Sequence, residues 1–455
     1  MKALCLPPLV AVLAGCAATA PEPVQGRLFL PPPGYATDLP PSGLIEDWWL
    51  GFDDPVLVRL VERGLEANLD VEAATDRLQA AAAVVRAERA DRLPSIDLGA
   101  EAGFNLGSDN GIAAAAGLTG LYNPDLSGRL AAEVLAAAAG YAEAEYLLAD
   151  QRRLVAAAVA SQYIDYRRTG AQLALLEEST ALQEQTLRIV TLRFEAGLSA
   201  NLDVRRAASD LAQTRARRGL VAIARADAAN ALAILLAENP GTFAPPPETG
   251  EQARIPDYVE GPPGGVPADL LRRRADILAA EARLVQAAAI IGIERADLRP
   301  SLVIPGSLAI GDGSLGGLLS DFIVTVGAAL DLPLFDGGRR RAEVAEARAL
   351  AEASLVQYRQ TFLVALAEVE NALVAIEAYQ QRNAALIEAI EQSETALSQS
   401  NALYREGLAS LFDVLDAQRQ LIASRQDLID SQAALAQSFV AFHAAVGSQG
   451  YYVRS

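Results

Sequence analysis

The feature that most constrains this chain is an internal repeat, because its second half restates its first. Residues 194–198 match residues 404–408, and residues 202–204 match residues 412–414, at a nearly constant offset of about 210 residues. A chain of 455 residues written in two such copies is expected to fold as two copies of one structural unit.

Each copy is predicted to contain a short helix, a β-hairpin, a long helix and a second short helix. In the first copy, residues 53–239, the last three elements are expected at about 95–122, 128–195 and 201–237. In the second copy, residues 268–447, they are expected at about 301–332, 338–405 and 411–447. The proline-rich stretch 240–267 is interpreted as the linker between the copies, and residues 448–455 as a C-terminal tail.

Strict alternation of apolar and polar residues predicts that the hairpin strands have two different faces. Over residues 95–107 one face carries isoleucine, leucine, alanine and phenylalanine, while the other carries serine, aspartate, glycine, glutamate and asparagine. Residues 322–331 also alternate and are predicted to form one strand. Eleven such residues of about 3.3 Å each, tilted near 45°, reach about 25 Å, which is the height of an outer-membrane apolar band.

Four strands of this kind cannot stand in lipid alone, because an open sheet edge leaves backbone groups unpaired at several kcal/mol each. In a membrane, copies of the chain would have to close them into a barrel of eight, twelve or sixteen strands. The residues alone do not choose among these numbers. A pair of hairpins in a soluble β-sandwich is the alternative interpretation.

The long helices carry apolar residues at seven-residue spacing, which is typical of coiled coils. In the second copy this series contains Leu355, Phe362, Val369 and Ile376. In the first copy the series shifts by four residues after Val155, a stutter that locally unwinds supercoiling and suits helices arranged as a cylinder. Residues 128–195 would extend roughly 100 Å at about 1.5 Å per residue. The predicted fold class is mainly α, with a four-stranded antiparallel β contribution.

The N-terminus has the pattern of a secretory signal peptide over residues 1–15. Its apolar run ends in Leu13-Ala14-Gly15-Cys16, which resembles the bacterial lipobox, in which cleavage frees the cysteine and its thiol receives lipid. We therefore expect a covalent lipid on Cys16 and a lipidated, extended arm over residues 16–52. The alternative is an ordinary signal peptide that is followed by a cysteine by chance.

Charge and histidine content argue against several classes of function. With 38 basic and 57 acidic residues the net charge is −19, which disfavours nucleic acid as a partner. The arginine runs 272–274 and 339–341 lie at predicted helix starts, where salt-bridged faces are expected. His443 is the single histidine and lies in an apolar helix, so we predict that it is packed rather than catalytic or metal-bound. No catalytic set, metal site or cofactor is expected.

Several motifs together resemble one known family. They are Asp-Trp-Trp at 47–49 with Phe-Asp-Asp-Pro at 52–55, Leu-Leu-Arg-Arg-Arg-Ala-Asp-Ile at 270–277, Leu-Pro-Leu-Phe-Asp-Gly-Gly-Arg at 332–339, and the two repeated Gly-Leu turns. The chain resembles the TolC superfamily, most closely its lipidated branch, the OprM/NodT-like outer-membrane factors of resistance-nodulation-division efflux pumps. One departure is Ala275, where relatives usually have proline, which should only soften the start of that helix.

The resemblance implies a homotrimer whose twelve strands form one transmembrane β-barrel above a long coiled-coil α-barrel. It also implies a lipid-anchored outer-membrane protein with a periplasmic helical tunnel. Its partners would be a periplasmic adaptor and an inner-membrane transporter of the resistance-nodulation-division class. The chain would passively conduct small molecules from them to the exterior, and it would not be an enzyme.

Two other interpretations stay open from the sequence. An outer-membrane duct of a type I protein secretion system shares the same fold. A periplasmic coiled-coil adaptor also has long helices and can be lipidated, but it has no lipid-facing strand pairs.

The resemblance assigns roles to the two glycine turns that join long and short helices. They would form the periplasmic tips that receive adaptor hairpins, through Gly197, Leu198, Ser199, Gly407, Leu408 and Ala409. The exposed leucine beside each glycine has no other evident use. The alternative is that these residues are simply turns.

Just after the turns, the resemblance places a narrow aperture. Its predicted residues are Asp203, Tyr404, Phe412, Asp413, Asp416 and Arg419. Carboxylates from three chains would make a cation-selective constriction, held closed by contacts such as an ion pair between Asp416 and Arg419. Where TolC has an arginine two residues after the tip glycine this chain has Ala409, so the resemblance does not extend to that particular latch. The alternative is an ordinary solvated helix face.

Overall fold

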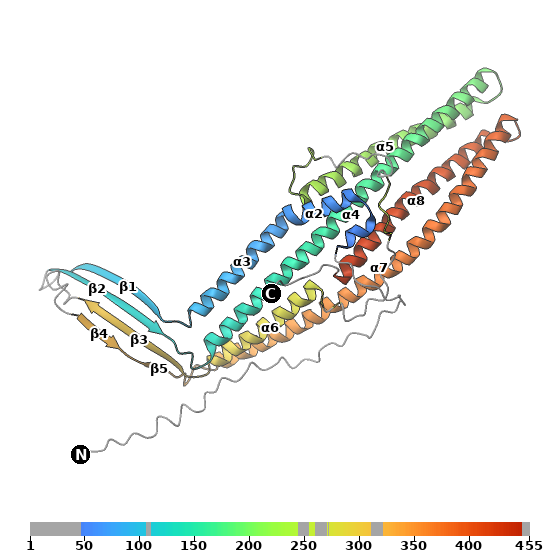
Figure 1. The fold of residues 1–455 in the computed structure, drawn as a ribbon. Coiled ribbons are helices and arrows are strands. Elements are labelled where there is room, and N and C mark those ends of the chain that lie inside the picture. Colours follow the sequence, from blue (N-terminus) through green and yellow to red (C-terminus); the bar gives the residue numbers. More distant parts are fainter. Residues whose placement is uncertain are drawn as a thin grey trace, which may run out of the picture. The chain divides into compact units, whose positions relative to one another are not determined.

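The computed structural model describes residues 47–105, 111–243, 254–259, 271, 273–310 and 322–447. The predicted signal peptide, Cys16, most of the arm, most of the linker and the C-terminal tail lie outside these residues. The described residues are mainly helical with one small antiparallel sheet, as predicted (Figure 1). The chain divides into two compact units, each built from both halves of the sequence.

Unit 1 comprises residues 1–30, 75–147 and 276–361, and it contains the sheet. The strands are β1 (Ser95–Asn105), β2 (Gly111–Tyr122), β3 (Ser301–Ile310), β4 (Phe322–Val326) and β5 (Ala329–Asp331). Their order is β1-β2-β3-β4 with every neighbouring pair antiparallel, and β5 also pairs with β3. The hairpins of the two sequence halves therefore join through β2 and β3.

The single strand predicted at 322–331 is interrupted at Gly327, which gives β4 and β5 instead. Both segments keep the same register against β3, since Gly306 pairs with Val326 and Ser301 pairs with Asp331. At the break Gly327 N donates to Pro305 O at 3.0 Å, but Pro305 has no N–H to return a bond. The proline on the neighbouring strand therefore interrupts the ladder without changing its register.

The register gives the sheet one apolar face and one polar face. Leu98, Leu118, Leu308 and Val324 pair in one row across the four strands. Asp97, Thr119, Ser307 and Thr325 form the neighbouring row on the opposite face. The apolar face is open to solvent in the single chain, with Leu98 77% exposed.

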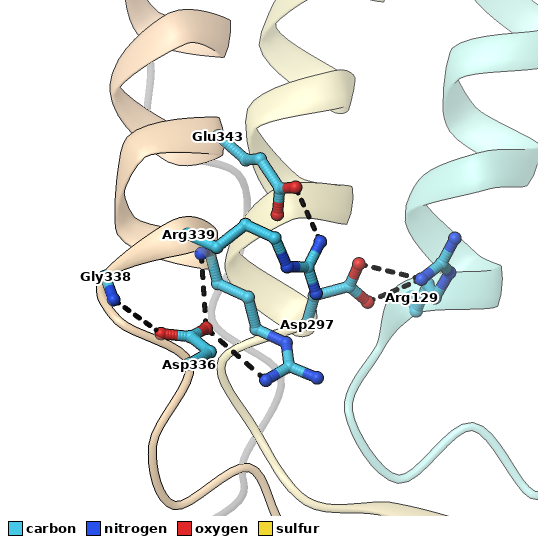
Figure 2. Close-up of polar contacts among 7 residues, drawn as sticks. Arg129, Asp297, Asp336, Gly338, Arg339 and Glu343 are labelled. Carbon is cyan, nitrogen blue, oxygen red and sulfur yellow. Dashed lines mark hydrogen bonds and ion pairs between the residues drawn. The ribbon is translucent and has the colours of Figure 1, made fainter.

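Aspartate side chains cap the N-terminal ends of the two longest helices, α4 (Arg129–Glu195) and α7 (Arg339–Arg405), which follow the strands in sequence. Asp125 accepts from Leu130 N and Ala131 N at 2.9 and 2.8 Å at the start of α4. Asp336 accepts from Gly338 N at 2.9 Å and from Arg340 N at 3.2 Å at the start of α7 (Figure 2). These backbone hydrogen bonds lower the pKa of Asp336.

An ion pair joins the start of α4 to the end of α6 (Ala275–Ala296) within unit 1. Arg129 Nη1 donates to both carboxylate oxygens of Asp297 at 2.6 and 2.8 Å (Figure 2). Arg129 Nε also donates to Glu133 at 2.9 Å. This contact links segments 168 residues apart in sequence.

Unit 2 comprises residues 31–74, 148–275 and 362–455. It contains α2 (Pro55–Ala67), the start of α3 (Leu69–Ala90), α5 (Asn201–Leu235), α8 (Leu411–Val446) and the remainder of α4 and α7. The single short helix predicted for the first copy is two helices, α2 and α3. Asn68 separates them because its Oδ1 accepts from Asp70 N at 2.9 Å while its Nδ2 donates to Leu235 O, also at 2.9 Å.

An aromatic cluster forms part of the core of unit 2. Trp48 stacks on His443 with ring centroids 5.6 Å apart, and Tyr258 stacks on Phe439 at 4.7 Å. Tyr258 comes from the predicted linker, and its neighbour Val259 donates from its N–H to Gly51 O at 2.9 Å. A Cβ at Gly51 would lie 2.5 Å from the Tyr258 ring, so glycine is required there. Trp48 is thus a packing residue.

None of the described helices combines the length and the hydropathy that a membrane-spanning helix needs.

Candidate channel tips and aperture

The turn between α4 and α5 is a Schellman motif built around Gly197. The φ angle of Gly197 is +73°, a left-handed conformation that glycine adopts without strain. Gly197 N donates to Phe194 O at 2.9 Å, and Leu198 N donates to Arg193 O at 2.8 Å. These bonds satisfy carbonyls at the end of α4 and reverse the chain.

A turn also joins α7 to α8 (Figure 1), and it repeats this geometry at the corresponding residues. The φ angle of Gly407 is +77°. Gly407 N donates to Tyr404 O at 3.1 Å, and Leu408 N donates to Leu403 O at 2.8 Å. Both turns therefore follow from one local sequence pattern, a helix end followed by Gly-Leu.

The leucines of both turns point their side chains into solvent. Leu198 is 68% exposed and Leu408 is 72% exposed, while Ser199 and Ala409 are half-buried. The sequence interpretation missed further exposed apolar side chains beside them, which are Leu192, Phe194, Leu202 and Leu403. The sequence signal that could have identified them is a cluster of apolar residues near each turn at positions outside the seven-residue series, which packs the helix core.

Behind the turns, a buried apolar cluster packs the α4–α5 hairpin against the α7–α8 hairpin. Its buried members are Val190, Leu397, Tyr404, Leu411, Val414, Leu415 and Leu421. Val190 comes from α4, and the others come from α7 and α8. The two hairpins are thus held together by apolar contacts close to their turns.

Asp413 has a local structural role that the sequence did not predict. It completes a capping box at the start of α8, where Ser410 N and Ser410 Oγ both donate to Asp413 Oδ2 at 2.9 and 2.8 Å. These hydrogen bonds, the Ser410 side-chain bond above all, lower the pKa of Asp413. One of its carboxylate oxygens is therefore engaged in capping.

Arg419 lies between two carboxylates. Its Nη2 is 3.5 Å from Asp416 Oδ1, which is the ion pair that the sequence suggested. Its Nε is 3.9 Å from Asp210 Oδ2 on α5, and its guanidinium lies 5.9 Å from the ring centre of Phe412. Asp210 was missed, although it follows Asp203 by seven residues and so lies on the same helix face.

Tyr404 is the buried member of the predicted aperture residues. Burial raises the pKa of its phenol, Arg193 opposes that shift, and Asp203 in the first turn of α5 adds to it. Arg193 lies over the ring, with its guanidinium carbon 4.7 Å from the ring centre. The sequence interpretation missed Arg193, whose only local signal was a cation in the last turn of a helix.

Within the part of the chain that the structure describes, no group of three or more histidine, cysteine, aspartate or glutamate side chains could hold a metal ion.

Comparison with known families decides what kind of protein carries these tips. The model of the family described as "Outer membrane efflux protein" matches residues 60–238 and 266–448. The chain belongs to this outer membrane efflux protein family. The two matched stretches lie one in each half of the sequence.

Individual relatives agree with this assignment. The chain is 30% identical to nodulation protein T of Rhizobium leguminosarum bv. trifolii, with 89% of this chain and 88% of the relative covered. It is 30% identical to outer membrane protein OprJ of Pseudomonas aeruginosa, with 84% and 82% covered. The solved structure of the outer-membrane channel OprN superposes with a TM-score of 0.84 at 28% identity, covering 93% of this chain and 99% of that one.

These findings confirm four predictions about this efflux protein. The resemblance to TolC-superfamily outer-membrane factors is confirmed, and so is the role as an outer-membrane exit duct of efflux. The protein resides in the outer membrane and is not an enzyme, since its relatives are outer-membrane efflux channels.

Proposed function

We propose that this efflux protein works as a homotrimer whose strands close into one twelve-stranded barrel, continued by a helical tunnel in the periplasm. The observation that supports this most is the sheet of unit 1. Its apolar face is open to solvent in the single chain, and its outer strands β1 and β4 each have one neighbour among the described strands. Lipid around the apolar face and copies of the chain at the edges would satisfy both.

In such a barrel the polar row of Asp97, Thr119, Ser307 and Thr325 would face the lumen. The charged residues of the described strands are Asp97, Glu101 and Asp331, which all lie on this polar face by register. Water in the lumen would solvate these carboxylates, which lipid could not do. The choice of three chains follows the resemblance to the TolC superfamily.

The same proposal includes an anchor and two partners. A lipid on Cys16 would hold the N-terminal arm in the outer membrane. A periplasmic adaptor would dock at Gly197, Leu198 and Ser199 and at the matching turn of Gly407, Leu408 and Ala409. The exposed apolar side chains at these turns support a protein partner there. An inner-membrane transporter of the resistance-nodulation-division class would supply small molecules.

Native mass spectrometry of the protein extracted in detergent tests the assembly. We expect the mass of three mature chains, each beginning at Cys16 and carrying lipid. The Cys16→Ser variant should lose the lipid mass and keep the trimer, because the anchor takes no part in strand pairing. A monomer would contradict the shared barrel, whereas two or four chains would give eight or sixteen strands.

Drug sensitivity of a strain lacking the gene tests the function. The strain should become sensitive to small toxic compounds, and the intact gene should restore resistance. The adaptor should copurify with the tagged protein, and this copurification should be lost when Leu198 and Leu408 are both replaced by aspartate. A strain that keeps its resistance but loses export of a protein would instead indicate type I secretion.

The Asp416→Ala variant tests the proposed aperture. Removing this carboxylate breaks the contact with Arg419 and leaves Arg419 with Asp210 as its remaining carboxylate partner. If Asp203, Tyr404, Phe412, Asp413, Asp416 and Arg419 of three chains form a latched constriction, single-channel conductance in planar bilayers should rise. Glu377→Ala removes an exposed carboxylate on α7 and provides the control, which should not change the conductance. Unchanged conductance of Asp416→Ala would reject the latch.

A further inference from the structure

Arg425 of α8 joins both hairpins of unit 2 through two carboxylates. Its Nη2 donates to Glu394 Oε1 of α7 at 2.7 Å, within its own α7–α8 hairpin. Its Nη1 donates to Glu178 Oε1 of α4 at 2.8 Å, on the α4–α5 hairpin. Arg425 therefore has one carboxylate partner inside its own hairpin and one on the neighbouring hairpin.

The internal repeat places matching residues in the other copy, and half of the same arrangement is formed there. Arg215 Nη2 of α5 donates to Glu184 Oε1 of α4 at 2.7 Å, which is the same pair of atoms at the same distance as in the Arg425–Glu394 pair. The carboxylate that would complete the arrangement is Glu388 of α7. At the repeat offset of 210 residues, the matches are Arg215 with Arg425, Glu184 with Glu394, and Glu388 with Glu178.

Arg215 and Glu388 are both exposed, and they do not contact each other within one chain. Among the described residues, neither Nη1 of Arg215 nor the carboxylate of Glu388 has a hydrogen bond or an ion pair. Arg425, in contrast, is half-buried between its two partners. Arg215 thus lacks the second carboxylate that Arg425 has.

The helix faces near these residues show the same difference in burial. Ile223 on α5 is 60% exposed, whereas its match on α8, Ala433, is 1% exposed. Val374 on α7 is 60% exposed, whereas its match on α4, Ile164, is fully buried. Positions that are buried on α4 and α8, which contact each other within one chain, are therefore apolar and uncovered on α7 and α5.

The two ends of the missing contact lie at the same level of the hairpins. Arg215 lies 18 residues after Gly197, and Glu388 lies 19 residues before Gly407. At about 1.5 Å per helical residue, each lies about 28 Å from its turn. A second chain placed beside the first, with its turns at the same level, would therefore bring Glu388 of one chain to Arg215 of the other. The matching pair within one chain has the same spacing and does meet.

We propose that Arg215 of one chain pairs with Glu388 of the next chain, so that the contact between chains copies the contact between the two halves of one chain. The partner of this surface is a second copy of the protein. The inference rests on the proposed homotrimer, in which α5 and α7 would each face a neighbouring chain. Three chains then carry six alike clusters of one arginine and two glutamates, three within chains and three shared between neighbours. A head-to-tail contact of this kind closes into a ring when the rotation between chains divides a full turn.

Cysteine cross-linking tests the contact directly, in a background in which Cys5 and Cys16 are replaced by serine. Arg215→Cys/Glu388→Cys treated with a short bismaleimide should give covalent dimers and trimers on a denaturing gel. Glu178→Cys/Arg425→Cys, the matching pair within one chain, should react but remain a single chain. In the control, Arg215→Cys is combined with Glu377→Cys, which lies on the same exposed face of α7 but about 16 Å from residue 388. Single chains only, or multichain products that are as abundant in this control, would overturn the inference.

Charge reversal tests whether the pair stabilises the trimer. Glu184→Arg/Arg215→Glu keeps the ion pair within the hairpin but places a carboxylate opposite Glu388 of the next chain. The rate at which detergent-held trimers dissociate should rise about thirtyfold, or about threefold for each of three exposed contacts. Adding Glu388→Arg restores opposite charges and should return the rate to that of the wild type, and high salt should reduce all these differences.

The outcomes separate this inference from the proposed function. Wild-type dissociation in Glu184→Arg/Arg215→Glu, or no recovery when Glu388→Arg is added, would overturn the pairing even in a protein that forms trimers. A wild-type protein that is monomeric by native mass spectrometry would instead overturn the proposed assembly itself.

Discussion

Replacing Arg274 by alanine is expected to lower the free energy of unfolding by about 2 to 3 kcal/mol, the worth of hydrogen bonds to a buried charge. Arg274 is only 2% exposed, and its Nη1 donates to Ala445 O at 2.6 Å and to Glu368 Oε2 at 2.8 Å. Glu368 stays half exposed, so water can solvate it after the change, which keeps the loss below that of a fully buried pair.

The position of Arg274 explains why its replacement should lower the free energy of unfolding by more than the loss of one ion pair. Ala445 lies in the last turn of α8, so the guanidinium satisfies a carbonyl at the C-terminal end of that helix. Its stem also fills the space beside Gly447, where an added Cβ would lie 2.9 Å from Arg274 Cγ. Arg274→Ala therefore removes a helix cap together with packing.

Thermal unfolding followed by circular dichroism of the detergent-solubilised protein measures this loss. Arg273→Ala is the matched control, because Arg273 is the exposed neighbour in the same arginine run and its loss should shift the midpoint little. Arg274→Met keeps most of the stem and should fall between alanine and wild type. Equal midpoints for Arg273→Ala and Arg274→Ala would contradict the buried-cap explanation.

Acidification should destabilise the wild-type protein through His443, and His443→Phe should remove this part of the pH dependence. Burial lowers the pKa of His443 from its ordinary value of 6.5 to about 3. Below pH 6.5 the unfolded chain binds a proton that the folded chain does not bind. Stability is therefore fully present above pH 6.5 and falls as the pH approaches the folded pKa. Between pH 6.5 and 4.5 the loss should be about 2 to 3 kcal/mol.

The aromatic surroundings of His443 make phenylalanine the suitable replacement. The imidazole stacks parallel to Trp48, and the rings of Tyr258 and Phe442 lie within 5.1 and 5.6 Å of it. Phenylalanine keeps a flat ring there and cannot take up a proton. Comparing unfolding midpoints at pH 7.5 and 4.5 separates this effect from that of the carboxylates, which both proteins share. Equal shifts in both proteins would contradict the assignment to His443.

Local sequence pattern predicted much of the fold and the turns of the site. Alternation over residues 95–107 gave the two faces of β1, because side chains along a strand alternate whatever the strand pairs with. Gly197 and Gly407 predicted the helix reversals, since a left-handed residue at a helix end favours glycine in any tertiary context. The sequence motifs indicated the family because each of them reflects a local structural requirement of this kind.

What the sequence could not provide were contacts between segments far apart in the chain. The interruption of the strand at Gly327 depends on Pro305 lying opposite it, and the division of the first short helix at Asn68 depends on Leu235. Arg193 is identified as a site residue only from the folded structure, in which its guanidinium lies over the ring of Tyr404 on α7.

The sequence by itself determined most of the helix and strand segments, where the chain reverses, and which strand face is apolar. The tertiary structure alone decided which polar side chains are buried and what they contact, including Arg193, Arg274 and His443. The physical reason is the distance along the sequence over which each determinant acts. Backbone conformation and side-chain periodicity are set within a few neighbouring residues, whereas burial and charge pairing depend on segments that meet only after folding.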